Sequence, residues 1–195
     1  MHEIIELSRL QVAGALGQVG LVDVDQVLSE AVDRARTTAE AKHVRLDIGG
    51  VQGTRVLGQH DLLVTAVRNL VDNAVAYSGE ASHVGVGVRL DGDLVEIAVV
   101  DEGIGITAAE QERVFERFYR VDPARSRDTG GTGLGLSIVK HVAADHGGEV
   151  TVWSQPGRGS TFTLRLPRAE EEPASTVREL SVTDIEGAHV RRSAS

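Results

Sequence analysis

The chain contains no cysteine, which excludes disulfide scaffolds and cysteine-ligated zinc or iron–sulfur sites. Aromatic residues make up only 3% of its 195 residues, so a core must be built from Val, Leu, Ile and Ala. No apolar run approaches the roughly 20 residues that span a bilayer, and the N-terminus lacks the basic start and apolar stretch of a signal peptide. The net charge of −9 is acidic, so no nucleic-acid partner is expected. These absences predict a cytoplasmic piece that is not inserted in a membrane.

The residues that are present suit a globular protein, with 41% hydrophobic and 25% charged side chains. One folded domain is expected over residues 18–167. Residues 1–17 have helical spacing but no N-terminal cap, which indicates the end of a longer helix; a natural short first helix is the alternative. After Pro167 the composition becomes acidic and polar, so residues 168–195 are interpreted as a mostly disordered tail.

Helices and strands are predicted to alternate along the chain. Apolar residues at helical spacing predict helices over residues 24–41, 61–77 and 134–145, with Asp23 and Asp61 capping the first two. Alternating residues predict strands over residues 44–48, 54–57, 83–90, 94–100, 149–154 and 160–166. Strand hairpins argue against an all-parallel sheet, and no early strand leads through a glycine motif into a helix as in a Rossmann fold. We expect an α/β (α+β) two-layer sandwich, with a mixed sheet of about five strands and helices on one face.

Two asparagines, Asn69 and Asn73, lie one turn apart on the second predicted helix and therefore share a face. Asparagine is a poor residue for a helix interior, so a pair in register needs a reason. An amide oxygen is a neutral, hard ligand that suits Mg²⁺ already bound to phosphates. From this cluster alone, a pair of solvated asparagines remains the alternative.

Two glycine-rich runs follow further along the chain. Asp101 comes directly after a predicted strand and precedes Gly103 and Gly105. A carboxylate there can accept a hydrogen bond from an exocyclic amine such as that of adenine, and the glycines let backbone approach a flat ring. The second run, Gly130–Leu136, enters a helix whose free N–H groups suit phosphate, but it has no Gly-Lys-Ser/Thr and is not a Walker A loop. Taken singly, the first run also fits an ordinary turn, and the second is a weak signal.

In this order and spacing, the three clusters resemble the N, G1 and G2 boxes of the GHKL ATP-binding superfamily. Between the last two, Val114–Arg120 looks like the F box of bacterial sensor histidine kinases. The resemblance covers residues 23–167 and implies the Bergerat fold, with ATP held under a flexible lid over residues 119–132. It also implies an enzyme, a protein-histidine kinase that transfers the γ-phosphoryl of Mg-ATP.

The resemblance assigns a role to each candidate site residue. It implies that Asn73 ligates Mg²⁺, that Asn69 contacts the phosphates or the metal, and that Asp101 takes the adenine amine. The other implied cofactor-binding residues surround the base or the triphosphate; they are Tyr77, Gly103, Gly105, Gly131, Gly133, Leu134, Gly135 and Thr161.

One position departs from the family pattern. The family often has Lys or Arg three residues after the metal-binding asparagine, whereas this chain has Ala76. A cation for the phosphates must then come from elsewhere, and the candidates are Arg117, Arg120 and Arg125 of the F box and lid.

None of the seven histidines has the context of the family's phosphoacceptor, which is followed by an acidic residue and then by a proline. His2–Glu3 begins that way but does not continue it. The resemblance therefore implies the catalytic part of a larger sensor kinase of the phosphate-responsive type, whose dimerisation and phosphoacceptor domain is reduced to residues 1–17. The implied partners are that domain and a downstream response regulator. The parent is expected to be a membrane-anchored homodimer, and the chain alone a monomer.

Three other functions remain as alternatives. A GHKL ATPase of the gyrase, Hsp90 or mismatch-repair type carries a glutamate base where this chain has Asn69, and an amide cannot accept the proton. An anti-sigma-type serine kinase is disfavoured by the phenylalanine-rich segment Phe115–Tyr119. A pseudokinase that binds nucleotide without catalysis is compatible with Ala76. Phe115 and Phe118 form either a docking face for the helical domain or plain core.

Overall fold

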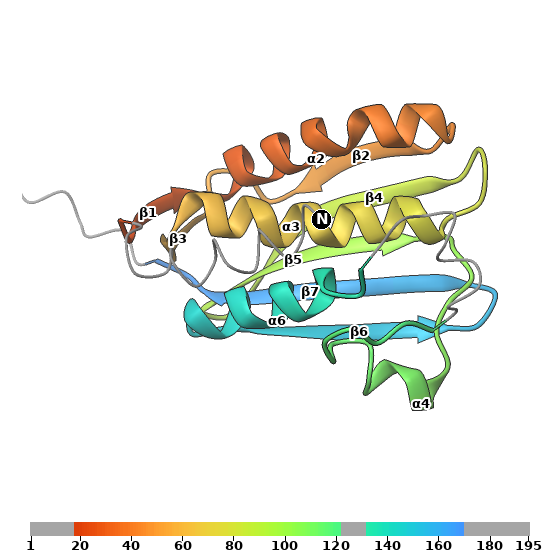
Figure 1. Cartoon of the computed structure of the whole chain (residues 1–195). Coiled ribbons are helices and arrows are strands. Elements are labelled where there is room, and N and C mark those ends of the chain that lie inside the picture. The colour runs from red at the N-terminus through yellow and green to blue at the C-terminus, as the bar shows by residue number, and fades with distance from the viewer. Residues whose placement is uncertain (1–17, 122–131, 170–195) are drawn as a thin grey trace, which may run out of the picture.

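The structure is a computed structural model, and it describes residues 18–121 and 132–169. Figure 1 shows its helices and strands, which follow one another as β1 (Gly20–Asp23), α2 (Val24–Ala41), β2 (Arg45–Gly50), β3 (Arg55–Gly58), α3 (His60–Tyr77), β4 (His83–Asp91), β5 (Leu94–Asp101), α4 (Ala108–Gln111), α6 (Gly135–Asp145), β6 (Glu149–Gln155) and β7 (Gly159–Pro167). The helix expected over residues 1–17, most of the expected lid and almost all of the expected tail lie outside the described residues.

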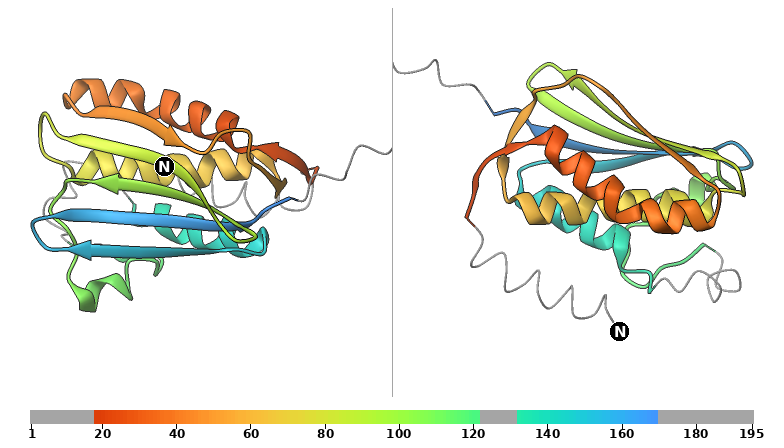
Figure 2. Two further views of the ribbon diagram at one scale, coloured as in Figure 1. Left: turned by 180° about the vertical axis from the view of Figure 1, so that it is seen from behind. Right: turned by 90° about the horizontal axis from the view of Figure 1, so that it is seen from above.

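The main sheet has five strands in the order β2-β4-β5-β7-β6. The β2–β4 pair is parallel, and the other three pairs are antiparallel, so the sheet is mixed. Figure 2 shows α2, α3 and α6 side by side on one face of this sheet, while the other face is free of helices. The expected two-layer sandwich, its mixed sheet and its two hairpins are therefore confirmed.

The core between the two layers is aliphatic, as the shortage of aromatic residues predicted. Alternate residues of β4 and β5 face the helices, because successive side chains of a strand point to opposite faces of the sheet. The helices pack broad apolar faces against these strand residues. The largest wholly buried aliphatic side chains are Leu28, Leu63, Leu70, Ile97, Leu134, Ile138, Leu164 and Leu166. This core fixes α3 and α6 against the sheet, and both helices contribute to the site described below.

The opposite face of the sheet carries a row of alternating charges instead of a second helix layer. Arg89, Glu96, Arg165 and Glu149 are directly cross-strand on β4, β5, β7 and β6. The Glu96 carboxylate accepts hydrogen bonds from Arg89 and, at 2.8 Å, from Arg165 Nε, and the side chain of Glu96 is 0% exposed. A buried carboxylate needs such partners, so the two arginines explain how Glu96 can be buried on a face without helices.

The helix starts were predicted only in part. Asp23 caps α2 as expected, because its carboxylate accepts from the backbone N–H groups of Asp25 and Gln26. The prediction that Asp61 caps α3 is wrong, since α3 begins at His60. The N-cap is Gln59, whose side chain makes no capping bond.

A two-stranded sheet of β1 and β3 was not expected. The strand over 54–57 pairs with β1, a segment before Asp23 for which no strand was predicted. The ordered chain also passes the expected end of the domain, since the N–H of Arg168 donates to Asp93 O at 2.8 Å and that of Ala169 to Arg55 O at 2.9 Å. The first bond ties the end of the main-sheet strand β7 to the β4–β5 turn, and the second joins it to β3 of the small sheet.

Candidate functional site: a nucleotide-sized cavity beside α3

A cavity of about 340 Å³ opens between α3, the start of α6 and the ends of β5 and β7. That volume is in the range of small-molecule and cofactor sites. Seven of the residues expected from the sequence line it together; they are Asn69, Asn73, Tyr77, Asp101, Gly105, Gly133 and Gly135. Segments far apart in the sequence therefore meet in one place. Gly131 lies outside the described residues.

Asp101 stands on the cavity wall at the end of β5 and is only 5% exposed. Its Oδ1 accepts hydrogen bonds from the backbone N–H of Gly103 at 2.8 Å and of Ser160 at 3.2 Å. Burial raises the pKa of the Asp101 carboxyl, and these hydrogen bonds oppose the rise. Since both backbone donors use the same oxygen, the carboxylate keeps acceptor capacity for a donor on a ligand.

The glycines after Asp101 are required by close contacts with backbone. A Cβ on Gly103 would lie 2.6 Å from Tyr77 O, so this residue brings the loop against the end of α3 without lining the cavity itself. Gly105 has a φ of +69°, and a Cβ there would lie 2.0 Å from Gln155 O. The loop is thus held between α3 and the β6–β7 turn, which fixes the cavity wall next to Asp101.

The structure does not bring Thr161 into the cavity. Ser160 and Phe162 line it, and because strand residues alternate, Thr161 points to the helix-free face of the sheet. There its cross-strand partners are Val100 and Trp153, which are 45% and 60% exposed. Ser160, which the sequence analysis passed over, is the residue of this strand that touches both the cavity and Asp101.

Asn69 and Asn73 line the cavity from α3, on one helix face as predicted. The Asn69 side-chain amide Nδ2 donates to Thr65 O at 2.9 Å, which fixes the orientation of the amide. Its Oδ1 faces the start of α6, where a Cβ on Gly135 would lie 2.9 Å away. A larger residue than glycine at the first position of α6 would therefore press on the Asn69 oxygen.

The start of α6 closes the cavity opposite these asparagines. Gly133 has a φ of +77° and accepts a hydrogen bond from the N–H of Phe118 through its carbonyl at 2.9 Å. Leu134 is the N-cap of α6, is 1% exposed and belongs to the core, so it anchors the loop and does not line the cavity. No side chain caps α6, whose first N–H groups have no partner within the helix, and Gly135 and Leu136 of this helix start line the cavity.

Comparison with known proteins identifies the family to which this chain belongs. Residues 58–170, more than half of the chain, match the family described as histidine kinase-, DNA gyrase B-, and HSP90-like ATPase. The chain belongs to this ATPase family. The expected resemblance and fold are therefore confirmed.

The most informative relatives of this family member are sensor kinases. Identity to the sensor-like histidine kinase SenX3 of Mycolicibacterium smegmatis is 57% over 165 residues, which cover 85% of this chain and 43% of SenX3. The phosphate regulon sensor protein PhoR of Pseudomonas aeruginosa is 34% identical over 170 residues, 87% of this chain and 38% of PhoR. The solved mycobacterial sensor histidine kinase MprB superposes with a TM-score of 0.68 at 31% identity, covering 79% of this chain and 100% of that one. The chain spans less than half the length of the two curated relatives.

In the segment that resembles an F box, Val114–Arg120, one phenylalanine packs against the core and the other is exposed. Phe115 packs against the core and meets the Phe162 ring edge-on, with ring centroids 6.3 Å apart. Phe118 is 67% exposed and has a φ of +64°, a strained value for a residue with a side chain. The two phenylalanines therefore have different surroundings, which their spacing in the sequence did not reveal.

Helix α2 contributes residues that the sequence analysis missed. Arg34 and Thr38 of α2 line the cavity, as do Arg68 and Ala76 of α3. Of the expected cation sources, Arg120 lines the cavity and Arg117 does not, while Arg125 lies outside the described residues. No motif identifies Arg34, because its place depends on how α2 packs along α3 (Figure 1).

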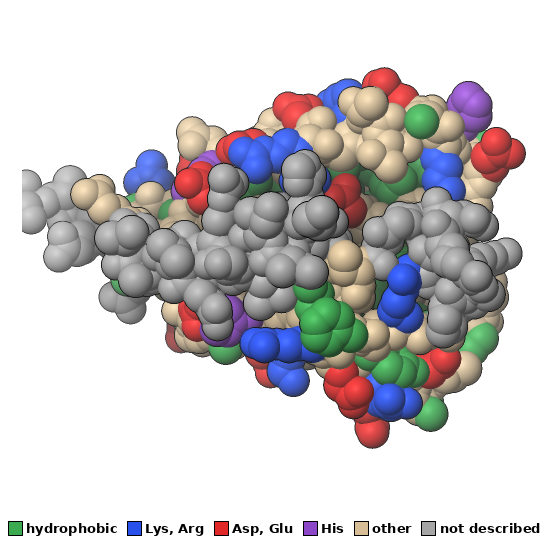
Figure 3. Space-filling view, in the orientation of Figure 1, with side chains coloured by type: hydrophobic (Ala, Val, Ile, Leu, Met, Phe, Trp, Pro, Cys, Tyr) green, Lys and Arg blue, Asp and Glu red, His purple; other side chains and the backbone are tan. Residues whose placement is uncertain are grey.

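Figure 3 shows Lys and Arg side chains interspersed with Asp and Glu side chains on the helix-bearing face. Across the described ranges, none of the helices combines the length and apolar character that a membrane crossing needs.

Proposed function

We propose that this chain is the ATP-binding catalytic domain of a two-component sensor histidine kinase, and that it presents the γ-phosphoryl of Mg-ATP to a histidine on a separate helical domain. The observation that carries the proposal is the single cavity that joins Asp101, the two asparagines and the start of α6. The family and the named sensor kinases among its relatives support the same activity.

Adenine recognition falls to the deep wall of the cavity. The Asp101 carboxylate accepts the exocyclic amine, and the flat base lies beside the backbone of Gly105 and near Tyr77. Ser160 replaces Thr161 as the hydroxyl residue at this end, because it contacts Asp101 through its N–H and lines the cavity. Gly103 acts indirectly by holding the loop against Tyr77 O.

The phosphates then extend along α3 toward the start of α6. Gly133 and Gly135 bring backbone N–H groups and the positive helix end close to them. The Asn73 amide suits Mg²⁺, which keeps several waters and takes few protein oxygens beside those of phosphate. Bound Mg²⁺ supplies neutralisation of phosphate charge, while Asn69 contacts the phosphates or the metal with its oriented Oδ1.

The absence of a carboxylate at Asn69 favours transfer over hydrolysis. A water nucleophile needs a base within hydrogen-bond reach, and the Asn69 amide, whose Nδ2 already donates to Thr65 O, cannot take a proton. We therefore propose a kinase that depends on an external histidine and hydrolyses ATP slowly. Its partners are the parent's dimerisation and phosphoacceptor domain and a response regulator. The parent acts as a membrane-anchored homodimer with this domain in the cytoplasm, whereas the chain alone is a monomer.

A labelling experiment tests the proposal. Incubated with γ-labelled ATP and Mg²⁺, the chain should stay unlabelled but should label the parent kinase's helical domain when that domain is supplied as a separate protein. Asn73→Ala, which loses the metal ligand, should bind Mg-ATP more than about tenfold more weakly, or 1.4 kcal/mol. Calorimetry measures that loss. Stable label on the chain itself, fast ATP hydrolysis, or parent-like affinity in Asn73→Ala would contradict the proposal.

A further inference from the structure

The phosphate end of the cavity needs positive charge, and the Arg68 side chain that α3 contributes to the cavity is already paired with a carboxylate of the same helix. Three or more negative charges of a triphosphate require more than one divalent ion for neutralisation, and Ala76 provides no cation. Among the described residues, the cationic side chains on the cavity are Arg34, Arg68 and Arg120. Arg68 forms an ion pair within α3, with its Nε 3.2 Å from Asp72 Oδ2. Arg34 is the cation that comes from a different helix.

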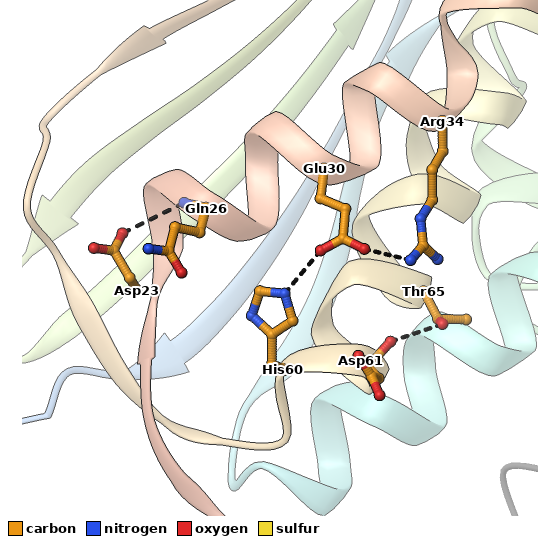
Figure 4. A network of polar contacts seen from close by, with 7 residues as sticks. All are labelled: Asp23, Gln26, Glu30, Arg34, His60, Asp61 and Thr65. Atoms are coloured by element: carbon orange, nitrogen blue, oxygen red, sulfur yellow. Dashed lines mark hydrogen bonds and ion pairs between the residues drawn. The ribbon is translucent and has the colours of Figure 1, made fainter.

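The guanidinium of Arg34 is directed by a short chain of polar contacts (Figure 4). The carboxylate of Glu30, one turn earlier on α2, accepts a hydrogen bond from Arg34 Nη2 through Oε1, and its Oε2 lies 2.9 Å from His60 Nε2 at the start of α3. The hydrogen bond from His60, followed by Arg34, lowers the pKa of the Glu30 carboxyl. Glu30 thereby ties Arg34 to α3 as well as to α2.

Most of the donor capacity of Arg34 remains for a ligand. A guanidinium has five N–H donors in a planar fork, and Glu30 is its one partner among the described residues. The side chain of Arg34 is 48% exposed and lines the cavity, so its other donors face the solvent that a phosphate would replace. Arginine is suited to such a bidentate contact with phosphate.

The direction of α3 indicates which phosphate lies nearest to Arg34. With the base against Asp101 and Tyr77, the asparagines Asn73 and Asn69 follow at successive turns toward the N-terminus of α3. Figure 4 shows Arg34 reaching from α2 toward the next turn, which carries Thr65. We propose that Arg34 binds the phosphate furthest from the base, across α3; this inference rests on the proposed function.

A pair of matched arginine variants tests the assignment. Arg36 lies on the same helix, forms a similar exposed ion pair with Asp33 at 2.9 Å, and does not line the cavity. We expect Arg34→Ala to weaken ATP binding by about tenfold or more, since charge-assisted hydrogen bonds are lost. ADP should lose less and adenosine nothing, while Arg36→Ala should bind all three like the parent. Calorimetric titration of each ligand with Mg²⁺ provides the affinities.

A conservative variant separates a direct contact from a structural effect. Arg34→Lys keeps a positive charge on the same side of the cavity but loses the planar fork, so it should bind ATP more tightly than Arg34→Ala and more weakly than the parent chain. Equal ATP affinity of Arg34→Ala and Arg36→Ala would overturn this inference alone, and so would an equal loss for ATP and adenosine. A folded parent chain that binds no nucleotide would overturn the proposed function together with it.

Discussion

At the scale of single residues, Asp101 connects ligand recognition with the stability of the domain. Burial raises the pKa of its carboxyl, although the N–H groups of Gly103 and Ser160 lower it in part. The folded protein therefore holds this proton more tightly than the unfolded chain. The stabilisation that comes from the proton is fully present below the unfolded-state pKa and is lost as the pH rises through the folded-state pKa.

Acidification should therefore change stability and ATP binding in opposite directions. As the pH falls through the raised pKa of Asp101, we expect weaker ATP binding, because a neutral carboxyl is a poorer acceptor for the adenine amine. The decrease should begin above pH of about 4, where an ordinary aspartate takes up its proton. Asp101→Asn should bind ATP at least about tenfold more weakly and lack this pH dependence. Calorimetric titrations across that range, with thermal unfolding of both proteins, provide the measurement.

GTP serves as the matched ligand for this prediction. Guanine presents a carbonyl oxygen where adenine has its amine, so two acceptors would face each other at Asp101 in a buried site. If the parent protein bound ATP and GTP equally, the carboxylate would not be the group that reads the base. A pH profile that persists in Asp101→Asn would assign the dependence to another residue.

Sequence reasoning located residues of the cavity where a motif fixes the backbone and missed them where side-chain direction decides. Gly103 and Gly105 were expected to let backbone approach a flat ring, whereas in the structure close contacts with Tyr77 O and Gln155 O also require them. Thr161 was expected at the base, but a shift of one residue along a strand reverses the face, and Ser160 lies there instead. Arg34 has no motif at all, since only the packing of α2 on α3 brings it to the cavity.

At the scale of elements, the start of α3 depends on a side chain from another helix. The backbone N–H of Gln59 donates to His146 Nε2 at 3.0 Å, and His146 Nδ1, 2.7 Å from Val142 O, donates to that carbonyl. The imidazole ring thus takes the place of a capping side chain. A Cβ on Gly58 would lie 2.3 Å from this ring, so glycine is needed beside it.

Removing this ring should destabilise the whole domain. We expect His146→Ala to lower the free energy of unfolding by about 1–3 kcal/mol, because a half-buried N–H loses its acceptor and the helix start loses its cap. Urea unfolding followed by circular dichroism measures the change. His141→Ala is the control, since His141 is exposed on the same helix and its pairing with Asp145 should contribute less than about 0.5 kcal/mol. Equal stability of the two variants would show that the imidazole does not cap α3.

The elements themselves were largely predictable. Helical and alternating periodicities located α2, α3, α6 and both hairpins, because each buries one continuous apolar face. A strand at β3 was expected, but β1 and its pairing with β3 escaped prediction, since a four-residue strand carries little pattern and its partner is distant in the sequence. The capping of α3 by His146 escaped for the same reason: the contact joins residues that are far apart along the chain.

At the scale of the whole molecule, the exposed ring of Phe118 is the feature that points beyond this domain. Phe115, three residues earlier, is explained by the core and its edge contact with Phe162. Phe118 is 67% exposed next to the start of α6, and its N–H bonds to Gly133 O at the cavity rim. In the proposed phosphotransfer, a histidine on another domain approaches this same rim. A large exposed apolar side chain at that place fits a docking contact better than a core role.

Phosphotransfer between separate proteins should therefore depend on Phe118, whereas ATP binding in the cavity should not. We expect Phe118→Ala to lower labelling of the parent's helical domain in trans several-fold, while its ATP affinity and melting temperature stay close to those of the parent. The strained φ does not confound the comparison, because alanine also carries a Cβ. Phe115→Ala is the contrasting variant: it removes a ring that packs against Phe162, so its melting temperature and ATP binding should fall together. Transfer in trans is expected to be weak, since without a covalent tether the effective concentration drops from about millimolar to that in solution. A docking contact should for that reason matter most in this assay, and parent-like transfer by Phe118→Ala would place the docking surface elsewhere on the molecule.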